Sequence, residues 1–225
     1  MRLLVFLILL FGPSPALLAA ENFDLTPVKK WIARQDEVRT VQADFTQTRA
    51  FRALQSPVAI PGHLWFSAPQ SLRWELGDPA KAILLRNGDT AYLIQPGKKR
   101  AERLPADHLG GRADSRNSAQ AFAMMKMPLA KDYADFNRQF EVLAVSTQEN
   151  RCHLEIIPRD ASAKKMLTAL KLDFDTTTGH LLTFEIALRD GSWLRNEFSN
   201  VRLNQKIERR VFDFDLAGYE IVEAK

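Results

Sequence analysis

The residues whose types could support chemistry are scattered along this chain. Its four histidines are His63, His108, His153 and His180. Their spacing gives neither the His-x-x-x-His pattern nor a Cys-x-x-Cys pattern that would hold a metal ion. The one cysteine, Cys152, alternates with polar residues in a strand-like run, which predicts a buried thiol rather than a reactive one. No serine lies in a Gly-x-Ser-x-Gly turn. We predict no catalytic site, no metal site and no cofactor.

Two neighbouring carboxylates are the remaining candidates for catalysis. Asp213 and Asp215 are two residues apart and could act as a pair in acid–base chemistry. They alternate with Phe212 and Phe214, however, which favours a strand over residues 211–216 with one face in solvent. A hydrolase is therefore the least favoured class, and we expect a binding protein that is not an enzyme.

The first residues predict export. A basic Arg2 precedes the apolar residues 3–11, and small residues follow up to Ala20. This order is typical of a secretory signal peptide, whereas a membrane-spanning helix needs about 20 apolar residues. We expect residues 1–20 to be a signal peptide and residues 21–225 to form a single domain.

The positive charge is local rather than general. The formal net charge is only +4, but Lys98, Lys99 and Arg100 lie together in a predicted loop. An exported chain is not expected to bind nucleic acid, so these residues could dock an acidic partner or an anionic membrane surface. Charges that merely keep the loop soluble explain the cluster equally well.

The segment between residues 62 and 105 predicts an antiparallel meander of four or five short strands. Apolar runs end at the turn residues Ala68-Pro69, Gly77-Asp78-Pro79, Asn87-Gly88-Asp89 and Pro96-Gly97. In several runs, large apolar residues occupy both alternate positions. Such a sheet has a strongly apolar face, which helices or a ligand must cover.

Helices are predicted on either side of this meander. Residues 23–40 have an apolar stripe near helical spacing, with Thr26 as the expected N-cap and Pro27 at the first helical position. Residues 106–118 are polar without a regular period. Residues 119–127 then form a second predicted helix, rich in methionine. Methionine suits surfaces that accept variable shapes, but core packing explains it as well.

The C-terminal part again predicts strands. Apolar residues alternate with polar ones in residues 170–175 and 182–188, and Asp190-Gly191 signals a hairpin to residues 193–201. Residues 211–216 are expected to close the sheet. Regular spacing of short strands indicates a sandwich or a barrel.

Several blocks resemble the LolA family of periplasmic lipoprotein carriers. The matching blocks, in order, are Ala43-Asp44-Phe45-Thr46-Gln47, Gly62-His63-Leu64-Trp65-Phe66 leading to Pro69, Arg73-Trp74-Glu75, Arg189-Asp190-Gly191-Ser192 and Val211-Phe212-Asp213-Phe214. The resemblance implies a mainly β fold, an unclosed antiparallel β-barrel covered by a lid of short α-helices. It also implies a periplasmic protein that takes acyl chains of lipoproteins from an inner-membrane donor to an outer-membrane acceptor. A monomer is the default expectation for such a shuttle.

Physical chemistry agrees with such a carrier, because exposing lipid to water costs about 0.8 kcal/mol per methylene. One departure from the family is Ala68, which stands where members have an arginine before the proline. The cargo is thus an acylated lipoprotein or another acylated lipid. The alternative is a non-carrier envelope sensor or interaction domain on the same fold. The residues expected to line the lipid cavity are Leu72, Trp74, Phe122, Met124, Met125, Phe184 and Ile186.

Overall fold

A computed structural model describes residues 23–52, 56–104, 130 and 132–223 of the chain. The strands are β1 (Thr40–Ala50), β2 (Val58–Ser67), β3 (Ser71–Leu76), β4 (Ala82–Asn87), β5 (Thr90–Gln95), β6 (Arg100–Leu104), β7 (Phe140–Gln148), β8 (Arg151–Pro158), β9 (Leu167–Asp175), β10 (Leu181–Leu188), β11 (Trp193–Leu203) and β12 (Glu220–Glu223). The helices are α1 (Thr26–Gln35), α3 (Tyr133–Gln139) and α4 (Ala161–Met166), with 3-10 turns η1 (Pro96–Lys98) and η3 (Arg209–Phe212).

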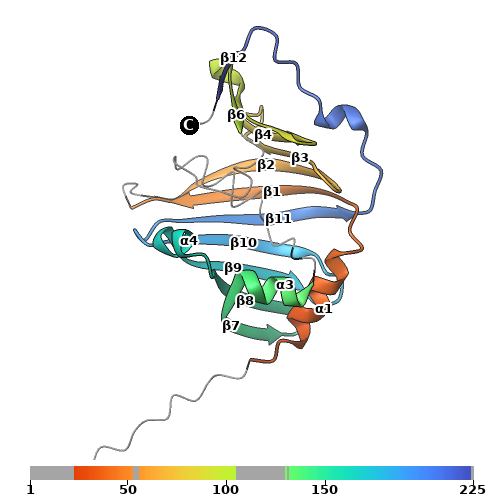
Figure 1. Cartoon of the computed structure of the whole chain (residues 1–225), viewed down its shortest axis with the longest axis vertical. Helices are drawn as coiled ribbons and strands as arrows, with labels where there is room; N and C mark the ends of the chain where they lie inside the picture. The colour runs from red at the N-terminus through yellow and green to blue at the C-terminus, as the bar shows by residue number, and fades with distance from the viewer. Residues whose placement is uncertain (1–22, 53–55, 105–129, 131, 224–225) are drawn as a thin grey trace, which may run out of the picture.

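These strands form one twelve-stranded sheet in the order β12-β6-β5-β4-β3-β2-β1-β11-β10-β9-β8-β7 (Figure 1). Every neighbouring pair is antiparallel except β12 and β6. The end strands β12 and β7 do not pair with each other, so the sheet is not closed. The predicted mainly β, unclosed fold is confirmed. No helix of the described residues is long and apolar enough to cross a membrane.

The predicted meander is confirmed, because β2 to β6 follow one another in space as they do in sequence. Successive apolar residues of its strands face opposite sides of the sheet and pack in two different hydrophobic clusters. Leu84 belongs to the large cluster on the face that α1 covers, which we call the inner face. Ile83 and Leu85 point to the outer face and form a second cluster. The residues that cover this outer cluster from the C-terminal segment are Phe214, Leu216 and Tyr219.

The predicted closing strand over residues 211–216 is wrong. Val211 and Phe212 belong to the turn η3, and the chain then runs over the outer face without pairing. The last strand is instead β12, which pairs with β6 in parallel. Phenylalanines that alternate with aspartates can pack onto a sheet from outside just as they can within it, so the alternation did not distinguish the two arrangements. Asp213 and Asp215 therefore do not form a strand pair.

The N-terminal helix is shorter than predicted and begins differently. The helix α1 starts at Thr26, which is inside the helix and is not its cap. Asp24 Oδ1 accepts a hydrogen bond from the Thr26 N–H at 3.0 Å instead. The buried residues of α1 are Val28, Trp31 and Ile32. The Trp31 ring stacks on Phe174 of β9, with 4.7 Å between the ring centroids. Figure 1 shows α1 and α3 lying over β8 and β9 on the inner face.

Three sequence predictions lie outside the described residues. They are the signal peptide over residues 1–20, the polar stretch over residues 106–118 and the methionine-rich helix over residues 119–127. The inner-face cover that the structure does describe consists of α1 and α3.

Candidate functional site

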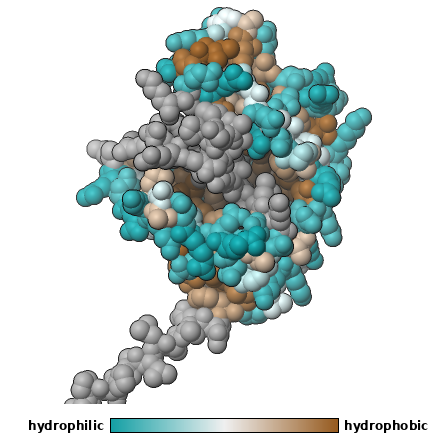
Figure 2. Space-filling view, in the orientation of Figure 1, coloured by the Kyte–Doolittle hydropathy of each residue, from teal (hydrophilic) through white to brown (hydrophobic). Residues whose placement is uncertain are grey.

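A cavity of about 320 Å³ opens on the inner face beside the C-terminal half of α1. Its volume is in the range of sites that hold small ligands, about 300–1,000 Å³. Figure 2 shows apolar surface in a hollow of this face, bordered by hydrophilic residues. The apolar side chains in the wall are Trp31, Val38, Val41, Ala43, Leu64, Phe66, Ala68, Pro69, Leu72, Trp74, Leu181, Phe198, Val201 and Leu203.

Strand alternation and register bring these side chains together. Ala43 of β1 pairs with Leu64 of β2, which in turn pairs with Trp74 of β3. Successive residues of a strand face opposite sides, so directly opposed residues of neighbouring strands share a side. The three form one apolar row across the inner face. Pairing of β1 with β11 adds a neighbouring wall, with Leu203 opposite Val41.

An aromatic cluster supports one side of the cavity, to whose wall it contributes Trp74 and Phe198. The ring of Phe45 lies 4.1 Å from that of Trp74, and both lie 6.1 Å from the ring of Phe198. Phe45 is directly opposite Gly62 on β2, where the missing side chain leaves room for the ring. Large aromatic surfaces of this kind offer apolar contact with little flexibility to lose.

The helix α1 forms a fixed wall of the cavity. The indole N–H of Trp31 donates a hydrogen bond to the Gly179 carbonyl at 3.0 Å. The guanidinium of Arg34 donates to the carbonyls of Thr176 and Thr177 at 3.1 and 2.8 Å. These bonds attach the last turns of α1 to the connection between β9 and β10.

Residues 36–215 match the sequence profile of the family described as outer membrane lipoprotein carrier protein LolA. The chain belongs to the LolA family. It is 22% identical over 207 residues to an outer-membrane lipoprotein carrier protein of Methylococcus capsulatus, covering 92% of each chain. The corresponding protein of Nitrosospira multiformis is 23% identical over 190 residues, with 83% of this chain and 84% of that protein covered.

Solved structures share the fold at very low sequence identity. An uncharacterized conserved protein from Thermus thermophilus superposes with a TM-score of 0.50 and 7% identity. The match covers 86% of this chain and 95% of that one. The LolA-family sheet is therefore an architecture that very different sequences adopt.

The residues predicted to line a lipid cavity occupy three kinds of position in this LolA-family chain. Leu72 and Trp74 are in the cavity wall. Phe184 and Ile186 of β10 lie on the same inner face, but they are buried in the core and do not contribute to this wall. The others, Phe122, Met124 and Met125, lie outside the described residues.

The predicted docking residues lie at the edge of the sheet, away from the cavity. Lys98 ends η1, Lys99 follows it and Arg100 begins β6, and all three side chains are exposed. The Glu220 N–H donates to the Lys99 carbonyl at 2.8 Å, so β12 lies beside them. Their exposure is compatible with contact to an external surface.

The arginines near Ala68, the position that departs from the LolA pattern, lie on different faces of the sheet. Ala68 is in the cavity wall, together with Arg39 and Arg86. Arg73 instead points to the outer face, where its guanidinium donates to the carbonyls of Val211 and Asp213 at 3.0 and 3.2 Å. Arg73 therefore clamps the C-terminal segment. Arg86 was missed by sequence reasoning, although its place opposite Leu72 follows from the register of the meander.

The histidine–carboxylate pairs of this LolA-family chain lie on the outer face. His63 Nδ1 is 2.8 Å from Asp44 Oδ1, and His153 Nδ1 is 2.8 Å from Asp173 Oδ1. Hydrogen bonds from Asn200 and His63 lower the pKa of Asp44. Within the described ranges, no group of three or more His, Cys, Asp or Glu residues could hold a metal ion. These pairs support the sheet surface and are separated from the cavity by the sheet itself.

Proposed function

We propose that this protein is a periplasmic carrier, which binds acyl chains of a lipoprotein or another acylated lipid and moves them between the inner and the outer membrane. Membership of the LolA family and the relatives named as lipoprotein carriers support this function. No covalent step is involved in the proposed mechanism, so the protein is not an enzyme. The alternative is an envelope sensor or interaction domain with the same fold.

The observation that carries the proposal is the apolar cavity on the inner face. Its wall combines side chains from β1, β2, β3, β11 and α1, all held by the sheet register and by the hydrogen bonds of α1. Each methylene moved from water into such a surface contributes about 0.8 kcal/mol. The affinity for an acyl chain should therefore grow with the number of methylenes that the cavity covers.

The path of the cargo follows from differences in affinity. An inner-membrane donor loads the acyl chain, and an outer-membrane acceptor that binds the chain more favourably removes it. The export signal over residues 1–20 is removed, and residues 21–225 act as a single domain and a monomer. The exposed Lys98, Lys99 and Arg100 dock an acidic partner or membrane surface, so salt should slow transfer.

Native mass spectrometry of the mature protein, purified from periplasm without detergent, tests the proposal. We expect a bound acylated species that denaturation releases and identifies. The matched variants are Leu72→Glu in the cavity wall and Leu143→Glu on the exposed edge strand β7. Leu72→Glu should lose the ligand because it buries a charge against the chain, whereas Leu143→Glu should keep it.

A protein that stays free of ligand after incubation with lipid would refute the carrier function. The envelope interaction domain would then be the better assignment. Equal ligand loss in Leu72→Glu and Leu143→Glu would show that the ligand is not in this cavity.

A further inference from the structure

The inner face carries a buried polar cluster beyond the aromatic residues. Gln47 of β1 and Asn196 of β11 are directly opposite each other and both are fully buried, with 0% exposure. Asn196 lies between Leu194 and Phe198 in the alternation of β11, and those two residues pack in the inner-face core. Arg49, two residues after Gln47, faces the same side. We call Gln47, Arg49 and Asn196 the polar cluster.

The hydrogen bonds of the polar cluster run in one direction. The Arg49 Nε–H donates to Gln47 Oε1 at 2.6 Å, and Gln47 Nε2 donates to Asn196 Oδ1 at 2.8 Å. A guanidinium has only donors, so it fixes the orientation of the Gln47 amide, which in turn fixes that of Asn196. Each amide oxygen thereby accepts one hydrogen bond within the cluster. What the cluster leaves available are N–H groups.

Two buried side-chain nitrogens of the described residues lack a hydrogen-bond partner there, namely Asn196 Nδ2 and Trp74 Nε1. Both belong to the inner face, since Trp74 also lines the cavity. The Arg49 guanidinium forms no ion pair with a described carboxylate, and burial lowers its pKa. Unpaired buried donors and an unpaired cation are unfavourable unless an acceptor reaches them.

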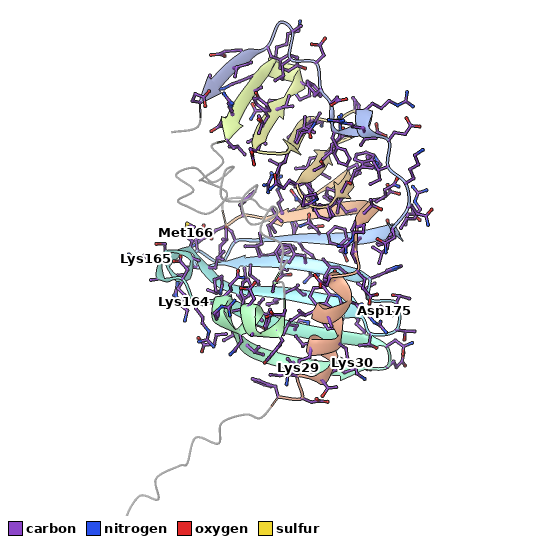
Figure 3. All side chains as sticks on the ribbon, turned by 45° about the vertical axis from the view of Figure 1, so that its right-hand side comes forward. Lys29, Lys30, Lys164, Lys165, Met166 and Asp175 are labelled. Atoms are coloured by element: carbon purple, nitrogen blue, oxygen red, sulfur yellow. The ribbon has the colours of Figure 1, made fainter. Side chains whose placement is uncertain are left out.

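The polar cluster lies beyond one end of the cavity on the inner face, where Phe198 of the cavity wall is two residues from Asn196 on β11. Val41 and Ala43 line the cavity near the start of β1, and Gln47 is about 20 Å from Val41 at the usual rise of a strand. Figure 3 labels residues at the two ends of β9, the third strand from β1 in the sheet, with Lys164, Lys165 and Met166 of α4 at one end and Asp175 at the other. Register places Arg49 toward the α4 end, because Arg49 opposes Leu194, Leu194 opposes Ile186, and Ile186 opposes Leu170.

We infer that the polar cluster binds the anionic or oxygen-rich head of an amphiphile whose acyl chain lies along the inner face toward the cavity. This inference rests on the proposed carrier function and adds the chemical class of the head group. Arg49 supplies charge and Asn196 Nδ2 supplies a hydrogen bond to a carboxylate or phosphate oxygen, both of which accept without donating. A cationic head would find only donors there.

Isothermal titration calorimetry of the mature protein with three dodecyl amphiphiles tests the inference. The probes are laurate, dodecyl phosphate and dodecyltrimethylammonium, each below its micelle concentration. We expect either anion to bind about 10- to 100-fold more tightly than the cation, as charge-assisted hydrogen bonds usually give. Whichever of laurate and dodecyl phosphate binds more tightly identifies a carboxylate or a phosphate as the head group.

Variants test whether the polar cluster causes the preference for anions. Arg49→Met should weaken binding of the anions about 10-fold or more and leave the cation nearly unchanged, while Arg202→Met, which removes the same charge from an exposed outer position of β11, should change neither. Asn196→Asp keeps an acceptor for Gln47, removes the free donor and offsets the charge of Arg49, so it should abolish the preference for anions. This second variant keeps the shape of the side chain, and it remains informative if Arg49→Met fails to fold.

The outcomes separate the inference from the proposed function. Binding of all three amphiphiles with similar affinity, unchanged in Arg49→Met and Asn196→Asp, would overturn the inference and leave the carrier function intact. Failure of the unmodified protein to bind any of them would overturn both.

Discussion

Substituting Gly62 with alanine should damage the aromatic side of the cavity. Gly62 on β2 is opposite Phe45 on β1. A Cβ atom added at Gly62 would lie 2.5 Å from Phe45 Cε2, and it would also collide with Phe45 Cζ and with the backbone carbonyl oxygen of Glu75. The ring could rotate only by disturbing its contact with Trp74 at 4.1 Å. The carbonyl belongs to the pairing of β2 with β3 and cannot rotate away.

The size of the effect follows from these two obstacles. An extra methyl group in a well-packed core usually costs about 1–3 kcal/mol of unfolding free energy. Because one obstacle is backbone, we expect the upper part of that range, about 2–3 kcal/mol. For a chain of this size that corresponds to a fall in melting temperature of roughly 4–12 °C. Displacing the Phe45 ring should also weaken binding of an acyl ligand.

Thermal unfolding followed by circular dichroism measures this prediction. Gly97→Ala in η1 is the matched control, because a Cβ there meets no heavy atom within 4 Å. Phe45→Leu, combined with Gly62→Ala, should recover the part of the cost that the ring causes, so the double variant should be more stable than the sum of the single effects predicts. Equal melting temperatures for the Gly62→Ala and Gly97→Ala proteins would refute the packing argument.

Three further predictions concern the outer face and the core. Arg73→Met should lower the free energy of unfolding by about 3 kcal/mol, because it leaves Glu75 without the guanidinium that lies 2.6 Å away. Amide hydrogen exchange should also become faster in the C-terminal segment that Arg73 holds. Unchanged exchange there would count against this role. The pKa of Asp173 is lowered although burial opposes it, because Thr183, Arg151 and His153 donate hydrogen bonds to it. The carboxylate of Asp173 therefore stabilises the fold fully above the usual pKa of 3.8, and this stabilisation is lost as the pH falls toward its lower pKa in the folded protein. The urea midpoint of Asp173→Asn should accordingly depend less on pH in this acidic range than that of the unmodified protein. Cys152 is fully buried, and burial raises the pKa of its thiol, so it should react with a maleimide only when the protein opens. Fast labelling of the native protein would contradict this burial.

Local patterns predicted the strands of the meander, but they misplaced the last strand of the chain and could not predict which distant strands pair. Turn residues divided the meander correctly, since each strand there pairs with the next in sequence. The pairing of β1 with β11 joins residues about 150 positions apart, such as Gln47 and Asn196. No local period encodes that contact. The polar cluster and the cavity wall from β11 therefore could not be predicted from the sequence.

Alternation also leaves the two faces of a strand equivalent. Leu72 and Trp74 were assigned to the cavity, and the structure places both in its wall. Phe184 and Ile186 show the same alternation, yet they are buried in the inner-face core. Which part of an apolar face stays open depends on what packs above it, and that is a property of the whole fold rather than of the strand.

The dimensions of the cavity bear directly on transfer. A carrier must hold its ligand through water and still give it up, and the free energy it supplies grows with the number of methylenes it covers. The α1 side of the cavity is held in place by the hydrogen bonds of Trp31 and Arg34, so we do not expect α1 to open. A cavity of about 320 Å³ with one fixed wall covers a limited length of chain. An acceptor that covers more methylenes, or pairs the head group better than the polar cluster does, would then draw the ligand away without any input of energy.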